Sequence, residues 1–295
     1  MSRVLQSALQ RMLKAETSQL SLSQLTLAQR KALTDFGTLT GAVLQQQQGR
    51  GSVFRVLNRA VIEQHLSDMG ASTDPEAGLP QRAINMARQR SSKAGQHRHA
   101  LTYLLAKGVN GARWTRQDGV VLDLDQLTRQ QGAGVITLGE AEIDNWATEV
   151  TLWLVENQAL FDRLDWLPDQ QTATIVWYRG QLQNSIIDWL AKRPRAASVI
   201  IFPDYDGVGL QNYLRLKQAL QQQLRLWLMP GWQQKLLTFG NNQLWKNSAA
   251  EFSAAAREII KQQGFDEPAV LELLQAMQTS GLALEQEAIW LPVQS

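Results

Sequence analysis

Short apolar runs alternate with segments of helical spacing in the C-terminal half of the chain. The apolar runs lie at 150–155, 173–178, 199–202 and 224–228. The segments with helical spacing lie between them, at about 158–166, 180–193 and 208–223. Because parallel strands are joined by crossover helices, this βαβαβαβ order predicts an α/β domain with a parallel sheet and flanking helices.

The N-terminal part has a different pattern. Helical spacing over 3–16 and 26–36 is followed by two short predicted strands within 39–57, around the basic turn Gly49-Arg50-Gly51, and then by a helix at 58–66. Thr26 is the expected N-cap of the second helix. Two helices followed by a hairpin with a basic tip are typical of a winged helix, so an α+β winged-helix-like domain is predicted before the α/β domain.

The middle of the chain connects these two patterns. We expect a helix over 80–92, a short helix at 99–107 and a small hairpin at 111–123. Gly132-Ala-Gly134 reads as a boundary. The predicted domains are therefore a winged-helix-like region at 1–134 and a catalytic domain at 135–295.

The composition limits the location and the metal chemistry. The chain has 295 residues, enough for two domains, with no Cys and three His. It has no apolar run of membrane-spanning length and no signal-peptide pattern at its start, so we expect a soluble, cytoplasmic protein with no membrane partner. Without Cys there is no thiolate zinc site, and any metal would be held mainly by oxygen.

Charge is distributed unevenly along the chain. Residues 1–140 carry 17 basic and 10 acidic side chains, a balance of +7, whereas 141–295 carry 12 and 17, a balance of −5. No acidic residue lies between Glu76 and Asp118. Such a basic segment is either a solvated helix face or a surface for a polyanion, and we expect it to bind double-stranded DNA. The candidate DNA-binding residues are Arg50, Arg55, Arg82, Arg88, Arg90, Lys93, Arg98 and Lys217.

The candidate chemistry lies where apolar runs end. Asp204 and Asp206 follow the run at 199–202, and side chains two apart in an extended strand share a face. Glu156 ends the run at 150–155, so two parallel strands side by side would bring it to the same edge. Carboxylates in this arrangement suit Mg²⁺ or Mn²⁺. An Asp-x-Asp-Gly segment is also a common turn that caps the next helix.

A Glu at the end of one strand and Asp-x-Asp-Gly at the end of a later one resembles the Toprim domain of topoisomerases, primases and several nucleases. The resemblance covers about residues 148–290. Tyr178-Arg-Gly-Gln181, the segment 204–210 with Tyr213 and Lys217 on the following helix, and Gly281-Leu-Ala-Leu-Glu-Gln-Glu-Ala288 resemble the branch that contains the topoisomerase VI A subunit and the JetD/MksG nuclease subunits of Wadjet plasmid-defence systems. Residues 82–93 also resemble a JetD-type segment.

The resemblance implies a metal-dependent DNA endonuclease that cleaves plasmid or other foreign DNA. It implies Glu156 as metal ligand or general base, and Asp204 and Asp206 as ligands. Glu285 and Glu287, also two apart, are candidates for further ligands. The resemblance further implies a homodimer, since two sites on opposite strands would make a double-strand break, and delivery of the substrate by an SMC/kleisin-type motor complex.

Two alternatives stay open. A topoisomerase VI A-like enzyme needs a Tyr outside the catalytic domain that attacks the phosphate. Tyr103 is the only Tyr upstream, and its apolar, helix-like context predicts that it is buried. The other alternative is a non-catalytic Toprim protein that binds only DNA or a partner.

Overall fold

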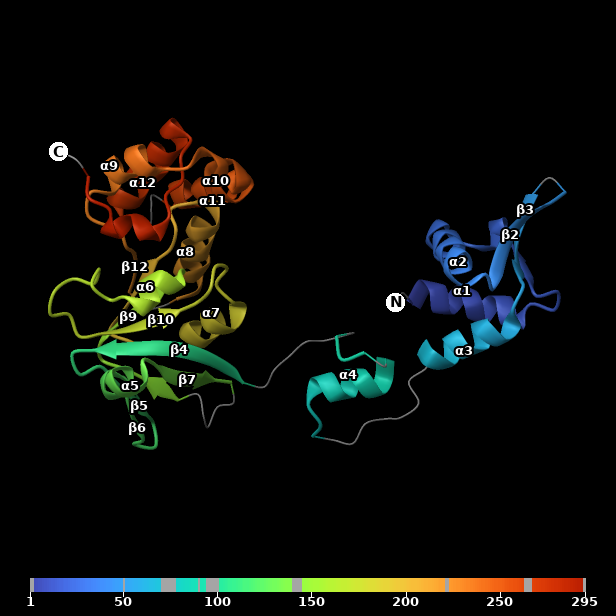
Figure 1. The fold of residues 1–295 in the computed structure, drawn as a ribbon, viewed down its shortest axis with the longest axis horizontal. Helices are drawn as coiled ribbons and strands as arrows, with labels where there is room; N and C mark the ends of the chain where they lie inside the picture. The colour runs from blue at the N-terminus through green and yellow to red at the C-terminus, as the bar shows by residue number, and fades with distance from the viewer. Residues whose placement is uncertain are drawn as a thin grey trace. The chain divides into compact units, whose positions relative to one another are not determined.

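The computed structural model describes residues 3–49, 51–69, 78–89, 91–93, 101–139, 145–220, 223–262 and 267–293. The chain forms two compact units, Met1–His99 and Ala100–Ser295, each with its own hydrophobic core (Figure 1).

The first unit combines helices with a small antiparallel sheet of order β1-β3-β2. This confirms the predicted order of two helices, a hairpin and a third helix, while a winged-helix identity stays a prediction. Its elements are α1 (Arg3–Lys14), β1 (Gln19–Ser21), η1 (Leu22–Gln24), α2 (Leu27–Thr40), β2 (Val43–Gln48), β3 (Gly51–Val56), α3 (Arg59–Met69) and α4 (Gln81–Gln89).

Apolar side chains from three helices and one strand form the core of this unit. Leu9 of α1, Leu33 of α2, Phe54 of β3 and Ile62 of α3 are at most 1 % exposed. Thr26 caps α2 as predicted: its Oγ1 accepts the Gln29 N–H at 3.2 Å, and the Gln29 side chain accepts the Thr26 N–H at 3.1 Å. This reciprocal capping box satisfies two backbone donors that the first turn of a helix leaves unpaired.

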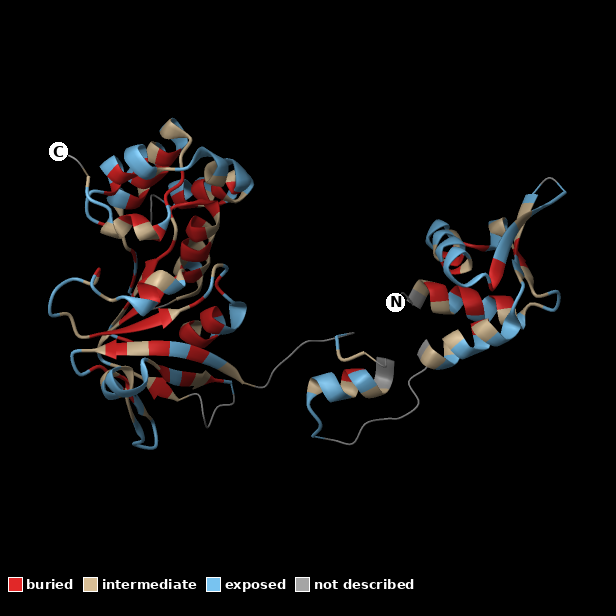
Figure 2. Ribbon diagram, viewed as in Figure 1, coloured by how far each residue is buried: buried red, intermediate tan, exposed pale blue. Residues whose placement is uncertain are grey.

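The second unit is built on a mostly parallel six-stranded sheet of order β12-β11-β9-β10-β4-β7. Strands β9, β10, β11 and β12 pair in parallel, and β4 is antiparallel to both of its neighbours. The central strands are almost completely buried (Figure 2). The strands are β4 (Thr102–Val109), β7 (Gly134–Leu138), β9 (Thr151–Val155), β10 (Ala173–Trp177), β11 (Ser198–Phe202) and β12 (Leu224–Leu226).

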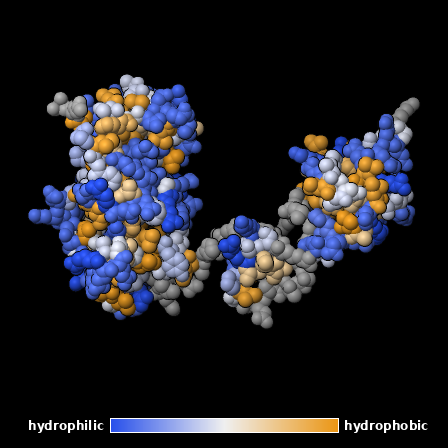
Figure 3. All heavy atoms as spheres, in the orientation of Figure 1, coloured by the Kyte–Doolittle hydropathy of each residue, from blue (hydrophilic) through white to orange (hydrophobic). Residues whose placement is uncertain are grey.

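Helices and a smaller sheet complete this unit. The smaller sheet, of order β6-β5-β8, contains the predicted hairpin at 111–123. Figure 3 shows hydrophilic side chains over most of the visible face of the unit, with smaller apolar areas between them. The remaining elements are β5 (Arg113–Arg116), β6 (Val121–Asp123), α5 (Leu124–Gln131), β8 (Trp146–Ala147), α6 (Gln158–Asp162), α7 (Asn184–Ala191), α8 (Gly207–Ala219), α9 (Trp232–Phe239), α10 (Asn242–Asn247), α11 (Ala249–Lys261), α12 (Pro268–Ser280) and η3 (Gln286–Trp290).

The strand order places a topological switch point between β9 and β11. The chain leaves β9 toward β10 on one side, whereas it leaves β11 toward β12 on the other. In open α/β sheets the crevice at the carboxyl ends of two such strands is the usual binding site. The strands that end in Glu156 and in the Asp pair are therefore the two that flank the switch point.

One predicted element is wrong. The short helix expected at 99–107 is the strand β4, which alternates between buried residues such as Leu104 and Ala106 and more exposed ones such as Tyr103 and Leu105. Apolar residues stand on both of its faces, so the period of two is hidden in the sequence.

The division between the units also differs from the predicted boundary at Gly134. It falls between His99 and Ala100, because β4 pairs with β10 and β7 in the large sheet. Residues 101–134 therefore belong with the α/β unit.

Within the described residues, no helix combines the length and the apolar character that crossing a membrane requires.

We expect a fragment of residues 100–295 to fold alone, and a fragment of residues 135–295 to fail. The shorter fragment lacks β4, so β7 loses its partner and β10 gains an open edge. Thermal melting followed by circular dichroism should show a cooperative transition for the longer fragment only. A cooperative transition at the same temperature for both would contradict the assignment of β4 to this core.

Candidate active site

Glu156 follows β9 directly and is 8 % exposed. Its Oε2 accepts the Tyr178 hydroxyl at 3.1 Å and the backbone N–H of Asp204 at 3.3 Å. Tyr178 follows β10 and Asp204 follows β11, the two strands that flank β9. The carboxylate of Glu156 is thus held by both neighbouring strand ends.

Asp206 is the N-cap of α8. Its Oδ1 accepts the Gly209 N–H at 2.7 Å, so the capping function expected of such a turn is present. The side chain is 7 % exposed. Capping is compatible with a charged role, because the positive end of a helix favours a carboxylate.

Two glycines allow the close packing around this cap. A Cβ at Gly209 would lie 2.0 Å from the Asp204 carbonyl oxygen, and one at Gly207 would lie 2.1 Å from the Ser248 carbonyl oxygen. The Gly207 N–H also donates to Ser248 Oγ at 3.1 Å. Any larger residue at either position would therefore displace the turn that carries both Asp residues.

Asp204 is tied to residues from two distant parts of the chain. Its Oδ1 accepts the Gln286 backbone N–H at 2.8 Å and the Asn157 Nδ2–H at 3.0 Å. An isolated bridge between Tyr205 and Leu284 brings the C-terminal segment to this place. The segment 284–287 therefore forms one wall of the site.

This segment carries the two predicted additional carboxylates. Glu287 Oε2 accepts from the same Asn157 Nδ2 at 3.1 Å, so one amide joins Asp204 and Glu287. The Asn157 N–H in turn donates to Gln286 Oε1 at 2.9 Å. Glu285 is exposed, and its charge contributes to the raised pKa of Asp206. The structure thus brings together all five acidic residues that the sequence singled out.

Burial and mutual repulsion govern the electrostatics of this cluster. The pKa of Glu156 is raised to about 7, mainly by burial and then by the charges of Asp206 and Glu287. The pKa of Asp204 is raised to about 8, mainly by burial and then by the charges of Glu156, Asp206 and Glu287. The pKa of Asp206 is also raised, mainly by burial. The hydrogen bonds from backbone N–H groups lower these pKa values, but they offset only part of the rise that burial and the neighbouring charges cause.

The donor set fits a hard divalent cation, because it consists of carboxylates and amide oxygens without sulfur or imidazole. A cation would also relieve the repulsion that raises these pKa values. In the described part of the chain, no three acidic, His or Cys side chains are arranged as a metal-binding group. Joint coordination by Glu156, Asp204 and Asp206 therefore requires rotation of at least one side chain.

Lys217 does not reach this cluster. Its Nζ donates to Glu267 at 2.7 Å and to the Leu224 carbonyl at 2.9 Å. It lies on α8 eleven residues after Asp206, roughly 16 Å along the helix axis. Its ion pair ties α8 to the start of α12, so in this structure Lys217 is engaged within the protein, and its role as a DNA-binding residue stays a prediction.

The other predicted DNA-binding residues belong to the first unit. Arg55, Arg82 and Lys93 are exposed, as a role at the surface requires. The side chain of Arg88 on α4 lies outside the described residues, and so do Arg50, Arg90 and Arg98 entirely.

The basic segment is interrupted by the division between the units. Arg113 and Arg116 lie in the second unit and pair with Asp123 and Asp118. The Arg116 pair holds the pKa of the Asp118 carboxyl at about 2. Lys107 donates to the Asp162 carbonyl at 3.2 Å.

Tyr103 is 66 % exposed on β4, so the expectation that it is buried is wrong. On a helix its apolar neighbours would have enclosed it. On a strand its side chain leaves the sheet on the face opposite Leu104 and Ala106.

Sequence reasoning missed three polar residues of the site. Asn157 and Gln286 lie directly beside the predicted Glu156, Glu285 and Glu287, and only their position in the chain hinted at a role. Tyr178 belongs to the segment that carries the resemblance, but nothing in the sequence predicted its contact with Glu156. Its burial against Glu156 raises the pKa of its hydroxyl, which therefore stays a hydrogen-bond donor at neutral pH.

The model of one protein family, described as a domain of unknown function (DUF7281), matches residues 115–291. This range includes all five acidic residues, Asn157, Tyr178 and Gln286. It does not include β4 or the first unit. No curated protein matches the chain.

Replacing Asp204 by Asn is expected to stabilise the metal-free protein at pH 8. A carboxyl with a raised pKa in the folded state binds protons more tightly when folded, so its contribution is fully present below about pH 4 and is lost as pH rises through about 8. Asn keeps the Oδ1 acceptor for Asn157 and Gln286. The gain in unfolding free energy should be roughly 1–3 kcal/mol at pH 8, since one pKa unit corresponds to about 1.4 kcal/mol and several carboxylates share the repulsion.

Urea unfolding in EDTA at pH 5 and pH 8 measures this difference. Asp188→Asn, at an exposed position on α7, is the matched control and should change little. Equal or lower stability of Asp204→Asn at pH 8 would show that repulsion does not govern this site.

Proposed function

The chain belongs to the DUF7281 family, and we propose that it is a metal-dependent endonuclease that hydrolyses DNA phosphodiester bonds. The observation that carries this proposal is the convergence of Glu156, Asp204, Asp206 and Glu287 at the switch point of a parallel sheet. Structural roles alone do not account for four carboxylates at one sheet edge, because their repulsion is costly in the absence of a cation.

The proposed cation is Mg²⁺ or Mn²⁺, which neutralises charge on the phosphate and lowers the pKa of a bound water. Asp204 and Asp206 would hold it, with Glu287 and the more exposed Glu285 as further oxygen donors. Glu156 would hold the cation or take the proton of the attacking water. Tyr178 keeps Glu156 oriented through its hydroxyl, and Asn157 keeps Asp204 and Glu287 together.

The resemblance to JetD supports the choice of substrate. In this proposal the basic side chains Arg55, Arg82 and Lys93 of the first unit contact the DNA backbone, and the α/β unit, with a Toprim identity, cuts it. A homodimer with two sites would cut both strands of a plasmid, and an SMC/kleisin-type motor complex would deliver the DNA. The nuclease and the motor complex together would act in the cytoplasm as a defence against foreign DNA.

The topoisomerase-like alternative rests on one observation, the exposure of Tyr103. Its position weakens this alternative, because β4 is part of the large sheet and not of the first unit. The variant Tyr103→Phe distinguishes the two functions. If the unaltered protein forms a covalent adduct with DNA and this variant does not, the reaction is topoisomerase-like. If the variant hydrolyses DNA at an unchanged rate, the result supports the nuclease.

Incubation with supercoiled plasmid and Mn²⁺ or Mg²⁺ tests the nuclease. We expect nicked or linear product from the unaltered protein, and at least a hundredfold less from Asp204→Ala/Asp206→Ala, because the cation loses two ligands. EDTA should abolish cleavage. Asp188→Ala/Glu272→Ala removes two exposed carboxylates elsewhere and should cleave normally.

Cleavage that persists in Asp204→Ala/Asp206→Ala would place the reaction elsewhere or indicate a contaminant. If neither the unaltered protein nor its variants cleave the plasmid, the same assay with the motor complex added shows whether cleavage requires this partner. No cleavage there, together with intact activity of Asp204→Ala in cells, would establish the non-catalytic binding protein instead.

A further inference from the structure

Strands β4 and β10 separate at the edge of the sheet that holds the carboxylates. Their pairing ends at Val176 and Ala106, although β10 continues to Trp177 and β4 begins at Thr102. Over 102–105, β4 pairs with β7 and has no partner on the β10 side within the described residues. The backbone edge of β4 that faces β10 therefore keeps donors and acceptors available for a ligand.

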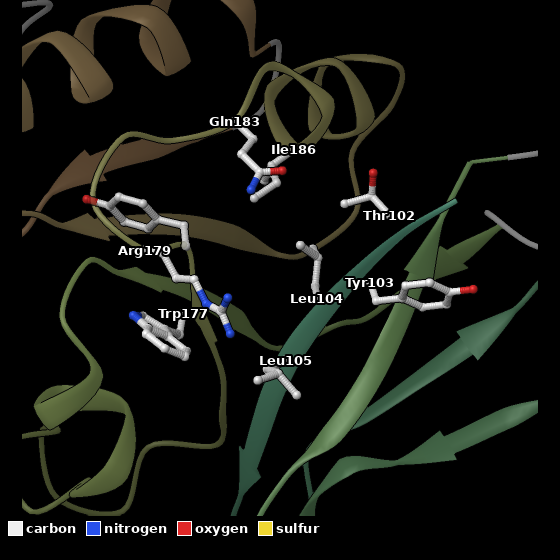
Figure 4. Close-up of a pocket in the computed structure, with 9 residues that line it drawn as sticks. Thr102, Tyr103, Leu104, Leu105, Trp177, Arg179, Gln183 and Ile186 are labelled. Carbon is white, nitrogen blue, oxygen red and sulfur yellow. The ribbon is translucent and has the colours of Figure 1, made fainter. Parts of the chain in front are cut away.

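A hollow of about 140 Å³ lies where the two strands separate. Leu104 and Ile186 give it an apolar floor, and both are buried. Figure 4 shows Arg179 and Trp177 on one side of the hollow and β4 on the other, with Gln183 above Leu104 and the Tyr103 ring pointing away from Arg179. A cavity of about 150 Å³ holds one benzene molecule, so the hollow has room for a single planar ring and not for a base pair.

Arg179 is held at the rim in an unusual conformation. Its φ is 61°, in the left-handed region that side chains other than Gly rarely adopt, and the φ of Gly180 is 66°. Its guanidinium carbon lies 4.4 Å from the centroid of the Trp177 ring, and that indole also stacks on Phe161. Arg179 is exposed, and no ion pair among the described residues involves it. Its left-handed backbone and its exposure at the rim are properties of a ligand-binding residue.

The helix that begins at Asp206 also fixes the loop that carries Arg179. Asn212 of α8, 1 % exposed, donates to the Gly180 carbonyl at 3.2 Å and accepts the Leu182 N–H at 3.2 Å. Arg215 of α8 donates to the Leu182 carbonyl at 3.0 Å. The position of Arg179 is therefore set by the same helix that positions the carboxylates.

The hollow and the carboxylate cluster share a wall. Tyr178 lines the hollow, and its hydroxyl donates to Glu156 at 3.1 Å. The Trp177 indole N–H donates to the Glu156 carbonyl at 2.9 Å. A ligand in the hollow thus lies next to the proposed reaction site.

We propose that this hollow binds one unpaired base of a nucleic-acid strand, with the Arg179 guanidinium as its stacking group. Arg179 is the exposed cation of its lining, and its guanidinium is planar. Bases stack on such groups whatever their sequence, and the positive charge favours the adjacent phosphate. The Gln183 amide and the unpaired edge of β4 can bond the base. This inference rests on the proposed function and adds that the strand to be cut is unpaired at this point.

Binding is measured in EDTA, so that it does not depend on cleavage. The probe is a single-stranded oligonucleotide with one 2-aminopurine, whose fluorescence falls on stacking, compared with the same strand in a duplex. We expect tighter binding of the single strand. Arg179→Ala should weaken it roughly tenfold, in line with the effect of losing a stacking group.

Two variants serve as controls. Tyr103→Ala removes a ring that points away from the hollow, and Arg257→Ala removes an exposed arginine on α11, so both should bind within twofold of the unaltered protein. An oligonucleotide made of abasic sugar-phosphates should compete poorly. Near-ultraviolet circular dichroism verifies that the variants are folded.

Equal affinity for single strand and duplex would overturn the inference. So would unchanged binding by Arg179→Ala, or full competition by the abasic strand. If the protein cleaves plasmid but Arg179→Ala binds the single strand as well as the unaltered protein does, this site is refuted and the nuclease is not. Base-dependent binding without any cleavage would leave the site established and refute the nuclease.

Discussion

The repulsion among buried carboxylates is the constraint on which the rest of this molecule depends. Glu156, Asp204 and Asp206 lie at the ends of two adjacent parallel strands, where burial and proximity raise all three pKa values. Folding offers backbone N–H groups, the end of a helix dipole and the Asn157 amide as partial compensation. These contacts offset only part of the repulsion, and a bound cation would relieve the rest.

The site depends on contacts over very different sequence separations. Asn157 touches Asp204 and the segment at 286–287, and the bridge between Tyr205 and Leu284 fixes that segment. None of these bonds can form before the sheet and the C-terminal segment are both in place. Loss of the last ten residues would therefore remove a wall of the site, even though the sheet would keep its strands.

The alternation of strands and helices and the acidic residues at the strand ends were predictable, because both depend on the local pattern of apolar and polar residues. Parallel strands that are buried on both faces appear as continuous apolar runs, and residues that end such runs must lie at one edge. Asn157 and Gln286 were not predictable, since their roles arise from hydrogen bonds between residues 129 and 130 positions apart. Strand β4 was mistaken for a helix because Leu101, Tyr103 and Leu105 are as apolar as the buried residues between them.

The two Asp residues are not equivalent, although they stand two apart in one motif. Asp206 caps α8, and the loss of such a cap costs about 0.5–2 kcal/mol of stability in addition to any chemical effect. Asp204 caps no helix and makes its contacts with Asn157 and the C-terminal segment. Substitution of Asp206 therefore weakens the helix that also holds the loop of Arg179, whereas substitution of Asp204 acts on the site itself. A loss of function in an Asp204 variant that stays fully folded is thus the more direct evidence on the chemistry of this edge.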